Sequence, residues 1–251
     1  MKVTAEDIFK ALKEDFKLID SEGYIRFNLK DFDIVVEQND VVGNVLEEWL
    51  AKWLNDKGYE NIHNLKQKSP DFWLDKENLS EGWLEVKSFT GSPNFDISSF
   101  RGYINEIVEI PWKLHAKYLL IKYRMENDGL VVIENIWLKN VWEICCTSKK
   151  WPIKVQDRNK VISNIRPATW YSKKPDFKPF ECLEDFLAAL EETIYNYHDT
   201  RSTIAETWAK SLCSNYKKYY GRDLILPRWM DVKVKYPKRL TKKELKKQAG
   251  S

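Results

Sequence analysis

The chain has 251 residues, of which 43% are hydrophobic and 31% charged, and it contains 11 tryptophans but only 9 glycines. Its length suits a single domain with a substantial core. The low glycine content and the lack of a GxxxxGK(S/T) segment argue against a nucleotide cofactor held by a phosphate-binding loop.

The net charge of +3 is unevenly spread: residues 1–60 carry 8 Lys and Arg against 14 Asp and Glu, residues 149–178 carry 9 against 2, and residues 215–247 carry 12 against 3. The two basic tracts predict a local surface for a polyanion, and for the last tract solvated lysines are an equal alternative.

No apolar run reaches the ~18 residues that a membrane-spanning helix needs, so we expect no membrane partner. Acidic residues interrupt the apolar positions of residues 1–16, which predicts an amphipathic helix and not a signal peptide. The four cysteines lack the spacing of a metal site. We therefore expect buried free thiols in a reducing compartment and residence in the cytoplasm.

The first elements follow from the spacing of apolar residues. Helical periodicity predicts helices over residues 4–18 and 40–57, the second ending at Gly58. Between them, residues 24–37 predict two short strands around Lys30-Asp31.

The rest of the chain predicts a mixed α/β sheet flanked by helices, because a strand–turn–strand unit is followed by a helix and another strand. The expected strands are 69–74, 83–89, 118–123, 130–133, 136–138 and 228–236, and the expected helices are 98–109, 182–197 and 203–220.

The strand segment WLEVK places two charged residues among apolar ones. Strand side chains alternate between faces, so Glu85 and Lys87 share one face while Leu84 and Val86 point into the core. A buried charge without a partner is costly, so this pair needs an explanation. A hairpin between the two neighbouring strands would place Asp71 beside Glu85.

Two carboxylates and an amine in one cluster suit phosphodiester hydrolysis. Mg²⁺ prefers hard oxygen ligands, which Asp71, Glu85 and the Val86 carbonyl could supply. Lys87 could then orient or deprotonate the attacking water and offset charge on the phosphate. A structural ion-pair network is the alternative. The proline before Asp71 and the 14-residue spacing to Glu85 favour the catalytic interpretation.

Pro70-Asp71 with Glu85-Val86-Lys87 resembles the motif of the PD-(D/E)XK nuclease superfamily at every position. The resemblance implies a restriction-endonuclease-like α/β (α+β) core with a central mixed sheet. It also implies that Asp71 and Glu85 bind the metal and that Lys87 is catalytic. Many members carry a further glutamate on the helix before the hairpin. Glu47 and Glu48 are the candidates here, and we expect Glu48.

Two further segments, Val41-Val42-Gly43-Asn44 and Ile165-Arg166-Pro167 with Trp170, are similar to the group of type II restriction endonucleases that includes NgoBV and NlaIV. This similarity implies a restriction-modification enzyme that acts as a homodimer on a short palindrome in double-stranded DNA, such as GGNNCC. We expect a single endonuclease domain over residues 1–251, with a catalytic core at about 40–145 and a DNA-contacting part at about 146–240.

The basic tract after residue 149 and the loop after Lys87 supply the expected DNA contacts, because Arg, Lys and Asn pair with base edges and phosphates. The predicted DNA-binding residues are Asn94, Lys154, Arg158, Lys160, Arg166 and Lys173. Two other functions compete with a restriction enzyme: a repair or junction nuclease of the same superfamily, and a non-catalytic DNA-binding domain.

Overall fold

The computed structural model describes residues 1–36, 38–66 and 68–240, and the chain divides into two compact units. Unit 1 consists of Met1–Phe95 and His115–Val141. Unit 2 consists of Asp96–Leu114 and the described residues after Val141. The expected organisation as one domain, with a DNA-contacting part from about residue 146, stays a prediction.

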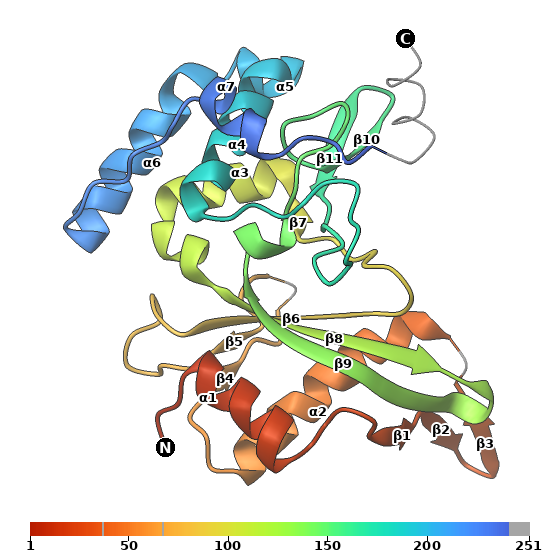
Figure 1. The fold of residues 1–251 in the computed structure, drawn as a ribbon. Coiled ribbons are helices and arrows are strands. Elements are labelled where there is room, and N and C mark those ends of the chain that lie inside the picture. Colours follow the sequence, from red (N-terminus) through yellow and green to blue (C-terminus); the bar gives the residue numbers. More distant parts are fainter. Residues whose placement is uncertain (37, 67, 241–251) are drawn as a thin grey trace. The chain divides into compact units, whose positions relative to one another are not determined.

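Unit 1 is built on a six-stranded sheet with the strand order β1-β9-β8-β6-β5-β4 (Figure 1). β6 and β8 run parallel, whereas the other neighbouring strands are antiparallel. The strands are β1 (Glu22–Tyr24), β4 (Ile62–His63), β5 (Phe72–Trp73), β6 (Trp83–Phe89), β8 (Lys117–Met125) and β9 (Leu130–Asn140). The predicted mixed sheet flanked by helices is confirmed.

β9 is one strand where the sequence predicts two. The polar residues Glu134 and Asn135 interrupt the apolar run and suggest a break. The strand instead continues through a shift in register, in which Lys122 pairs with Asn135 and Tyr123 with Ile133. The extra residue, Glu134, forms an ion pair of 2.7 Å with Lys122. A β-bulge therefore accommodates the polar residue without ending the strand.

Two helices cover the core of unit 1, as predicted. α1 (Ala5–Lys10) begins at a capping box in which the side chains of Thr4 and Asp7 each accept a backbone hydrogen bond from the other residue, and it continues as the π-helical turn η1 (Ala11–Asp15). α2 (Val42–Asp56) follows the short 3-10 turn η2 (Asn39–Val41). The largest buried side chains of this core include Ile8, Leu12, Leu50, Leu54, Phe72 and Leu74.

A separate hairpin, formed by β2 (Arg26–Leu29) and β3 (Phe32–Val35), precedes α2. Lys30 in its turn has a φ of 54°, the left-handed conformation that tight hairpins require. The two strands predicted around Lys30-Asp31 are therefore confirmed.

Unit 2 is mainly helical, with a small three-stranded sheet in the order β10-β11-β7. Its helices pack through apolar faces, and the Trp208 Nε1 donates a hydrogen bond of 2.8 Å to the Ile104 carbonyl. Within the described residues, no helix has the length and apolar character needed to cross a membrane. The elements are β7 (Ser98–Ser99), α3 (Phe100–Glu109), η3 (Pro111–His115), β10 (Val155–Arg158), β11 (Val161–Ile165), α4 (Leu183–Asn196), α5 (His198–Arg201), α6 (Ala205–Tyr220), α7 (Trp229–Val232) and η6 (Lys233–Lys235), with short 3-10 turns η4 (Asn127–Gly129) in unit 1 and η5 (Trp142–Ile144) in unit 2.

The four cysteines are free, with Cys145 and Cys146 buried and Cys182 and Cys213 half-buried. The expectation of free thiols is therefore confirmed, although full burial holds only for the first pair.

The strand expected over residues 228–236 is wrong, because this segment forms α7 and η6. Alternating polar and apolar residues suggested a strand, but Val232 and Tyr236 are the buried pair and lie four residues apart, a helical spacing. The Tyr236 hydroxyl donates a hydrogen bond of 2.6 Å to the buried Asp185 of α4. Contacts with α4 therefore determine the conformation of this segment more strongly than its alternation of polar and apolar residues does.

We expect Tyr236→Phe to lower the free energy of unfolding by about 1–3 kcal/mol, because Asp185 would lose a buried hydrogen bond and the Glu181 N–H a partly buried one. Urea denaturation measures this change. Tyr195→Phe is the control, because Tyr195 is 41% exposed on α4. Equal stability of the two variants would contradict the prediction.

Candidate active site

The β5–β6 hairpin sets the position of Asp71. Phe72 pairs with Leu84 and Trp73 with Trp83, and this register brings the preceding residue, Asp71, level with Glu85. The Asp71 Oδ2 accepts a hydrogen bond of 2.7 Å from the Val86 N–H. The predicted hairpin is therefore confirmed, and its pairing places the aspartate beside β6.

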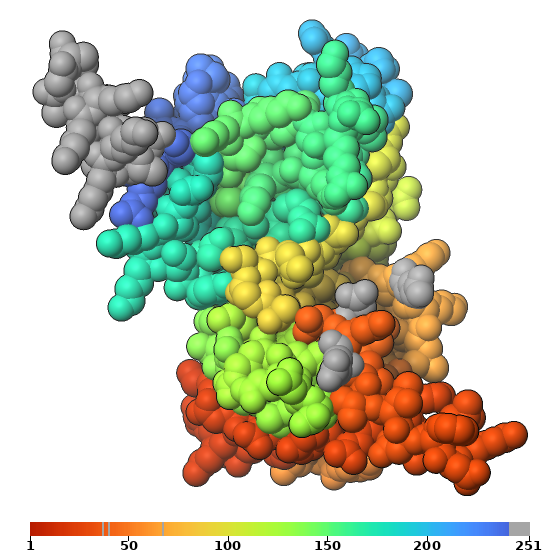
Figure 2. All heavy atoms as spheres, turned by 90° about the vertical axis from the view of Figure 1, so that its right-hand side faces the viewer, coloured from red at the N-terminus to blue at the C-terminus, as the bar shows by residue number. Residues whose placement is uncertain are grey.

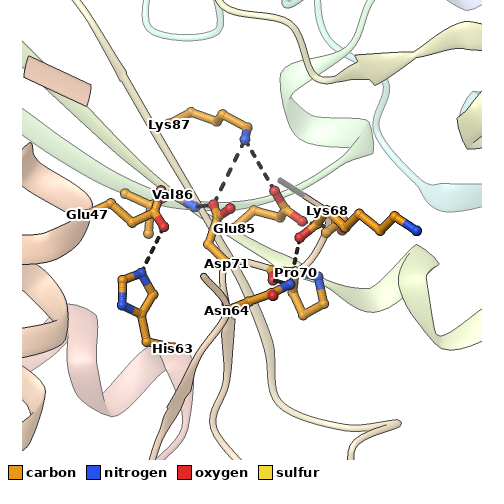
Figure 3. Close-up of polar contacts among 10 residues, drawn as sticks. Glu47, His63, Asn64, Lys68, Pro70, Asp71, Glu85, Val86 and Lys87 are labelled. Carbon is orange, nitrogen blue, oxygen red and sulfur yellow. Dashed lines mark hydrogen bonds and ion pairs between the residues drawn. The ribbon is translucent and has the colours of Figure 1, made fainter. Parts of the chain in front are cut away.

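Glu85 and Lys87 meet Asp71 on one face of β6 (Figure 3). The Lys87 Nζ lies 3.3 Å from Glu85 Oε2 and 3.9 Å from Asp71 Oδ2. The side chains of Glu85, Asp71 and Lys87 are 5%, 18% and 23% exposed, so all three are largely withdrawn from solvent. Leu84 and Val86 belong to the core of unit 1, as the alternation of the strand predicts.

One ammonium balances two carboxylates in this cluster. Burial and then the charge of Glu85 raise the pKa of Asp71 to about 7, although Lys87 and the Val86 N–H act in the opposite direction. Burial acts to lower the pKa of Lys87, but the charges of Glu85 and Asp71 outweigh it and the pKa is raised. Lys87 therefore carries a positive charge at neutral pH, while Asp71 is held near its point of protonation.

The loop before Asp71 is fixed by residues that the sequence analysis did not single out. The Ser69 hydroxyl donates a hydrogen bond to Glu85 Oε1, and the Ser69–Pro70 peptide bond is cis. The Asn64 side-chain amide donates bonds of 2.8 Å to the carbonyls of both Lys68 and Pro70, and its backbone N–H donates to the Asp71 carbonyl. No spacing rule points to these contacts, because they depend on how the loop closes on itself.

Glu47, and not the expected Glu48, faces the cluster. Glu47 Oε1 accepts a hydrogen bond of 2.9 Å from His63 Nε2, and its charge acts on both Asp71 and Lys87. Glu48 is exposed to solvent on α2. Adjacent residues on a helix point about 100° apart, so only one of the two can face the sheet.

His63 is another residue of the site that the sequence analysis did not single out. Its ring stacks on Phe72, with the centroids 4.7 Å apart and the planes at 13°. His63 and Phe72 are a directly paired couple on β4 and β5. The pairing of β4 with β5 therefore fixes the His63 imidazole, which in turn positions the Glu47 carboxylate through a hydrogen bond.

The predicted DNA-binding residues fall in both units. Asn94 is exposed in unit 1, a few residues after β6. The others lie in unit 2. Among them, Lys154 donates to the Pro167 carbonyl at 2.8 Å and Arg166 forms an ion pair with Asp96. Arg158, Lys160 and Lys173 are exposed.

Unit 2 also contains a basic hollow of about 530 Å³. Its lining includes Lys149, Lys150, Lys154 and Lys174. Lys150 forms an ion pair with Asp157, so part of this charge is already neutralised.

Comparison with known proteins identifies the family. The chain matches the NgoBV restriction endonuclease family over residues 2–236. The chain belongs to this family. The type II restriction enzyme NlaIV of Neisseria lactamica is 42% identical over 243 residues, which cover 95% of this chain and 100% of NlaIV. The type II restriction enzyme NgoBV of Neisseria gonorrhoeae is 38% identical over 161 residues, which cover 63% of this chain and 91% of NgoBV.

The solved structure of the NlaIV restriction endonuclease matches with a TM-score of 0.90 at 42% identity, covering 95% of this chain and 98% of that chain. The predicted resemblance and fold class are therefore confirmed. Membership of the restriction endonuclease family also confirms the predicted enzyme class, a type II site-specific deoxyribonuclease, with double-stranded DNA as substrate and a divalent metal as cofactor.

The donor set of the cluster fits a divalent metal of the hard, oxygen-binding class. The carboxylates of Asp71 and Glu85 repel each other, and a cation bound between them would relieve that repulsion. Asp71 and Glu85 would be the side-chain ligands of such a cation, and a backbone carbonyl and water would supply further oxygen atoms.

We expect Asp71→Asn to stabilise the metal-free protein by an amount that grows between pH 5 and pH 8. The pKa of Asp71 is about 7 in the folded chain, well above the ordinary value of 3.8 that it takes in the unfolded chain, so the folded state retains a proton that the unfolded state releases. The free energy of unfolding of the native sequence therefore falls as pH rises through this range. The variant lacks that loss, which is on the order of 2 kcal/mol by pH 8.

Denaturation in urea with EDTA at several pH values measures the difference between the two proteins. Parallel pH profiles for Asp71→Asn and the native sequence would contradict the raised pKa. Added Mg²⁺ should stabilise the native sequence more than the variant, because a bound ligand stabilises only a protein that binds it.

Proposed function

We propose that this restriction endonuclease hydrolyses phosphodiester bonds with Mg²⁺ as its cofactor, at a short palindromic site and as a homodimer. The observation that carries the proposal is the cluster on one hairpin in which Lys87 lies within ion-pairing distance of both Asp71 and Glu85. A chain of this family acts on DNA inside the cell, so we also place it in the cytoplasm.

Asp71 and Glu85 are the proposed metal ligands, with the Val86 carbonyl between them in sequence. Their oxygen atoms match the preference of Mg²⁺, which is usually bound through one or two carboxylates and keeps several waters. When bound, the cation polarises the scissile phosphate and lowers the pKa of coordinated water. The bond from the Ser69 hydroxyl fixes the orientation of Glu85, and the bond from the Val86 N–H fixes that of Asp71.

Lys87 is the proposed catalytic cation. Its raised pKa keeps the amine protonated, so it donates hydrogen bonds rather than accepting a proton while the site holds its negative charge. An ammonium beside the scissile phosphate would orient the attacking water and offset the charge that develops on the phosphate oxygens. Glu47 is the proposed outer carboxylate in place of Glu48, and His63 positions it.

Sequence readout is proposed to come from Asn94 together with the basic residues of unit 2. Arg158, Lys160 and Lys173 are exposed and suit phosphate or base contacts, whereas Lys154 and Arg166 already hold protein partners. A palindromic target presents two equivalent half-sites, which a twofold homodimer matches. Sequencing the ends of cleaved plasmid tests this part, with GGNNCC as the first candidate. Discrete fragments with symmetric ends support it, and irregular nicking favours a structure-specific nuclease.

We expect Lys87→Ala to reduce the rate of DNA cleavage roughly 100- to 10,000-fold while leaving DNA binding unchanged. A plasmid digest with Mg²⁺ measures the first quantity and a gel-shift assay with Ca²⁺ measures the second. Lys122→Ala is the matched control, because Lys122 is also half-buried on a strand of the same sheet and paired with a carboxylate. Unchanged cutting by Lys87→Ala would refute the role given to Lys87.

Glu47→Gln and Glu48→Gln form a matched pair on one helix. We expect Glu47→Gln to lower the cleavage rate roughly 10- to 100-fold, because groups around a metal site usually contribute that much. Glu48→Gln should cut like the native sequence, because Glu48 is exposed away from the cluster. The opposite ranking would show that Glu48 is the functional glutamate after all.

A further inference from the structure

The β2–β3 hairpin presents a wholly apolar face to solvent. Phe27 pairs with Ile34 and Leu29 with Phe32, and directly paired residues of a hairpin lie on the same face. These four side chains are 52%, 54%, 60% and 75% exposed, in the order Phe27, Ile34, Leu29 and Phe32. An apolar residue alone on a surface is ordinary, but four on one small face are not.

The opposite face of the hairpin is more polar. It carries Arg26, Asn28, Asp33 and Val35, and Arg26 lies 3.7 Å from Asp33 in an ion pair. The hairpin is therefore an amphipathic ribbon. A two-stranded ribbon is marginally stable in water unless its apolar face is covered.

The base of the ribbon is fixed to unit 1, so its apolar face is displayed from a defined position. The Ile25 N–H donates to the Gly129 carbonyl, and the Val36 N–H donates to the Ile25 carbonyl, each at 3.0 Å. A Cβ at Gly129 would lie 2.8 Å from the Ile25 carbonyl oxygen and 2.9 Å from a Val35 methyl group, so only glycine fits there. The hairpin lies below the turn that joins β8 and β9 in Figure 1, and an orange-red segment reaches outward in the lower part of Figure 2.

Further apolar side chains are exposed near the base of the ribbon. A hollow of about 230 Å³ includes Ile25 and residues of α2 and is lined mostly by apolar side chains. Three of them are exposed: Phe16 (42%), Tyr24 (60%) and Val45 (43%). We call the combined surface the apolar arm patch, defined by Phe16, Tyr24, Phe27, Leu29, Phe32, Ile34 and Val45.

The size of the apolar arm patch suits a protein interface. Its seven side chains together expose roughly 600–700 Å², taking about 150–250 Å² for each full aromatic side chain and somewhat less for each aliphatic one. The largest apolar patches on ordinary monomers cover about 300–600 Å². A stable protein interface buries about 800 Å² on each partner. The exposed area of the patch therefore amounts to most of one side of a stable interface.

We propose that the apolar arm patch is the surface through which two copies of this chain associate. The inference rests on the homodimer of the proposed function and assigns that dimer its interface. In a twofold arrangement the same patch meets itself, so the apolar face of one ribbon packs against the equivalent face, or the adjoining hollow, of its partner.

The negative charge around the hairpin disfavours two other partners for the apolar arm patch, namely DNA and an anionic membrane. Residues 20–40 contain six acidic residues and two basic ones, which would repel DNA or an anionic membrane. The residues outside the described part do not supply an apolar cover either: residues 241–251 are rich in lysine, and their only large apolar residue is Leu245. A second apolar arm patch instead offers apolar side chains that can be buried against the first.

The double variant Phe27→Ser with Phe32→Ser tests the proposal. Both side chains are exposed in the single chain, so the substitutions should leave folding intact while weakening association on the order of 100-fold or more. Analytical ultracentrifugation of the purified full chain over a range of concentrations measures the dissociation constant. Ile225→Ser with Val234→Ser is the matched control, because these residues of unit 2 are 76% and 72% exposed.

A photo-reactive amino acid at position 32 gives a second measurement that does not depend on the stability of a variant. We expect a cross-linked band of twice the chain mass, with the second attachment in the apolar arm patch. A monomeric native protein, a dimer that survives the double substitution with normal affinity, or cross-links to DNA or to another surface would overturn the proposal.

The two proposals fail separately. A monomeric double variant should still nick DNA in a Mg²⁺-dependent manner if Asp71, Glu85 and Lys87 act as proposed. Lys87→Ala should remain dimeric whether or not it cuts. Loss of cutting without loss of dimer therefore bears only on the chemistry, and loss of dimer with residual nicking bears only on the interface.

Discussion

Two carboxylates that repel each other beside one ammonium define this molecule's site, and the surrounding contacts can be understood as responses to that repulsion. Glu85 is almost fully buried, and Lys87 neutralises only one of the two acids. Burial, together with the charge of Glu85, raises the pKa of Asp71. Hydrogen bonds from the Val86 N–H and the Ser69 hydroxyl satisfy carboxylate oxygens without cancelling that charge. The site therefore keeps an attraction for a cation that a neutralised ion pair would lack.

The sequence was sufficient wherever local geometry decides the outcome. Glu85 and Lys87 share a face because strand side chains alternate regardless of tertiary context, and the apolar spacing of α2 fixes its buried side. The hairpin that joins Asp71 to Glu85 was predictable because a polar turn separates two short apolar strands. The family resemblance rested on the same few residues, and the comparisons extend it to nearly the whole chain.

Prediction from the sequence failed where contacts between residues distant in sequence determine the local structure or the role of a side chain. Glu47 and Glu48 are equivalent in the helical pattern, and only the position of His63 on β4 distinguishes them. Asn64 and Ser69 act through the closure of one loop, which no periodicity encodes. Residues 228–236 were expected to form a strand, yet they are helical, and Tyr236 at their end donates a hydrogen bond to the buried Asp185 of α4. Polar contacts across elements thus carry information that a one-dimensional pattern does not contain.

The catalytic cluster and its supports are assembled from a short stretch of chain. Among the described residues, the hydrogen bonds from Ser69 and Val86 to the two carboxylates, and those from Asn64 to the loop before Asp71, join residues within the 25 positions from His63 to Lys87. Glu47 and the pairing of β6 with β8 come from outside this stretch. Contacts between near neighbours in sequence form quickly, because little loop entropy is lost on closure. After a local opening of this edge of the sheet, the geometry of the acids can therefore return without refolding of the remainder. Amino-acid substitutions in distant segments therefore leave the catalytic cluster in place. Segments that contact DNA can in this way change the base sequence that they recognise without loss of the cluster.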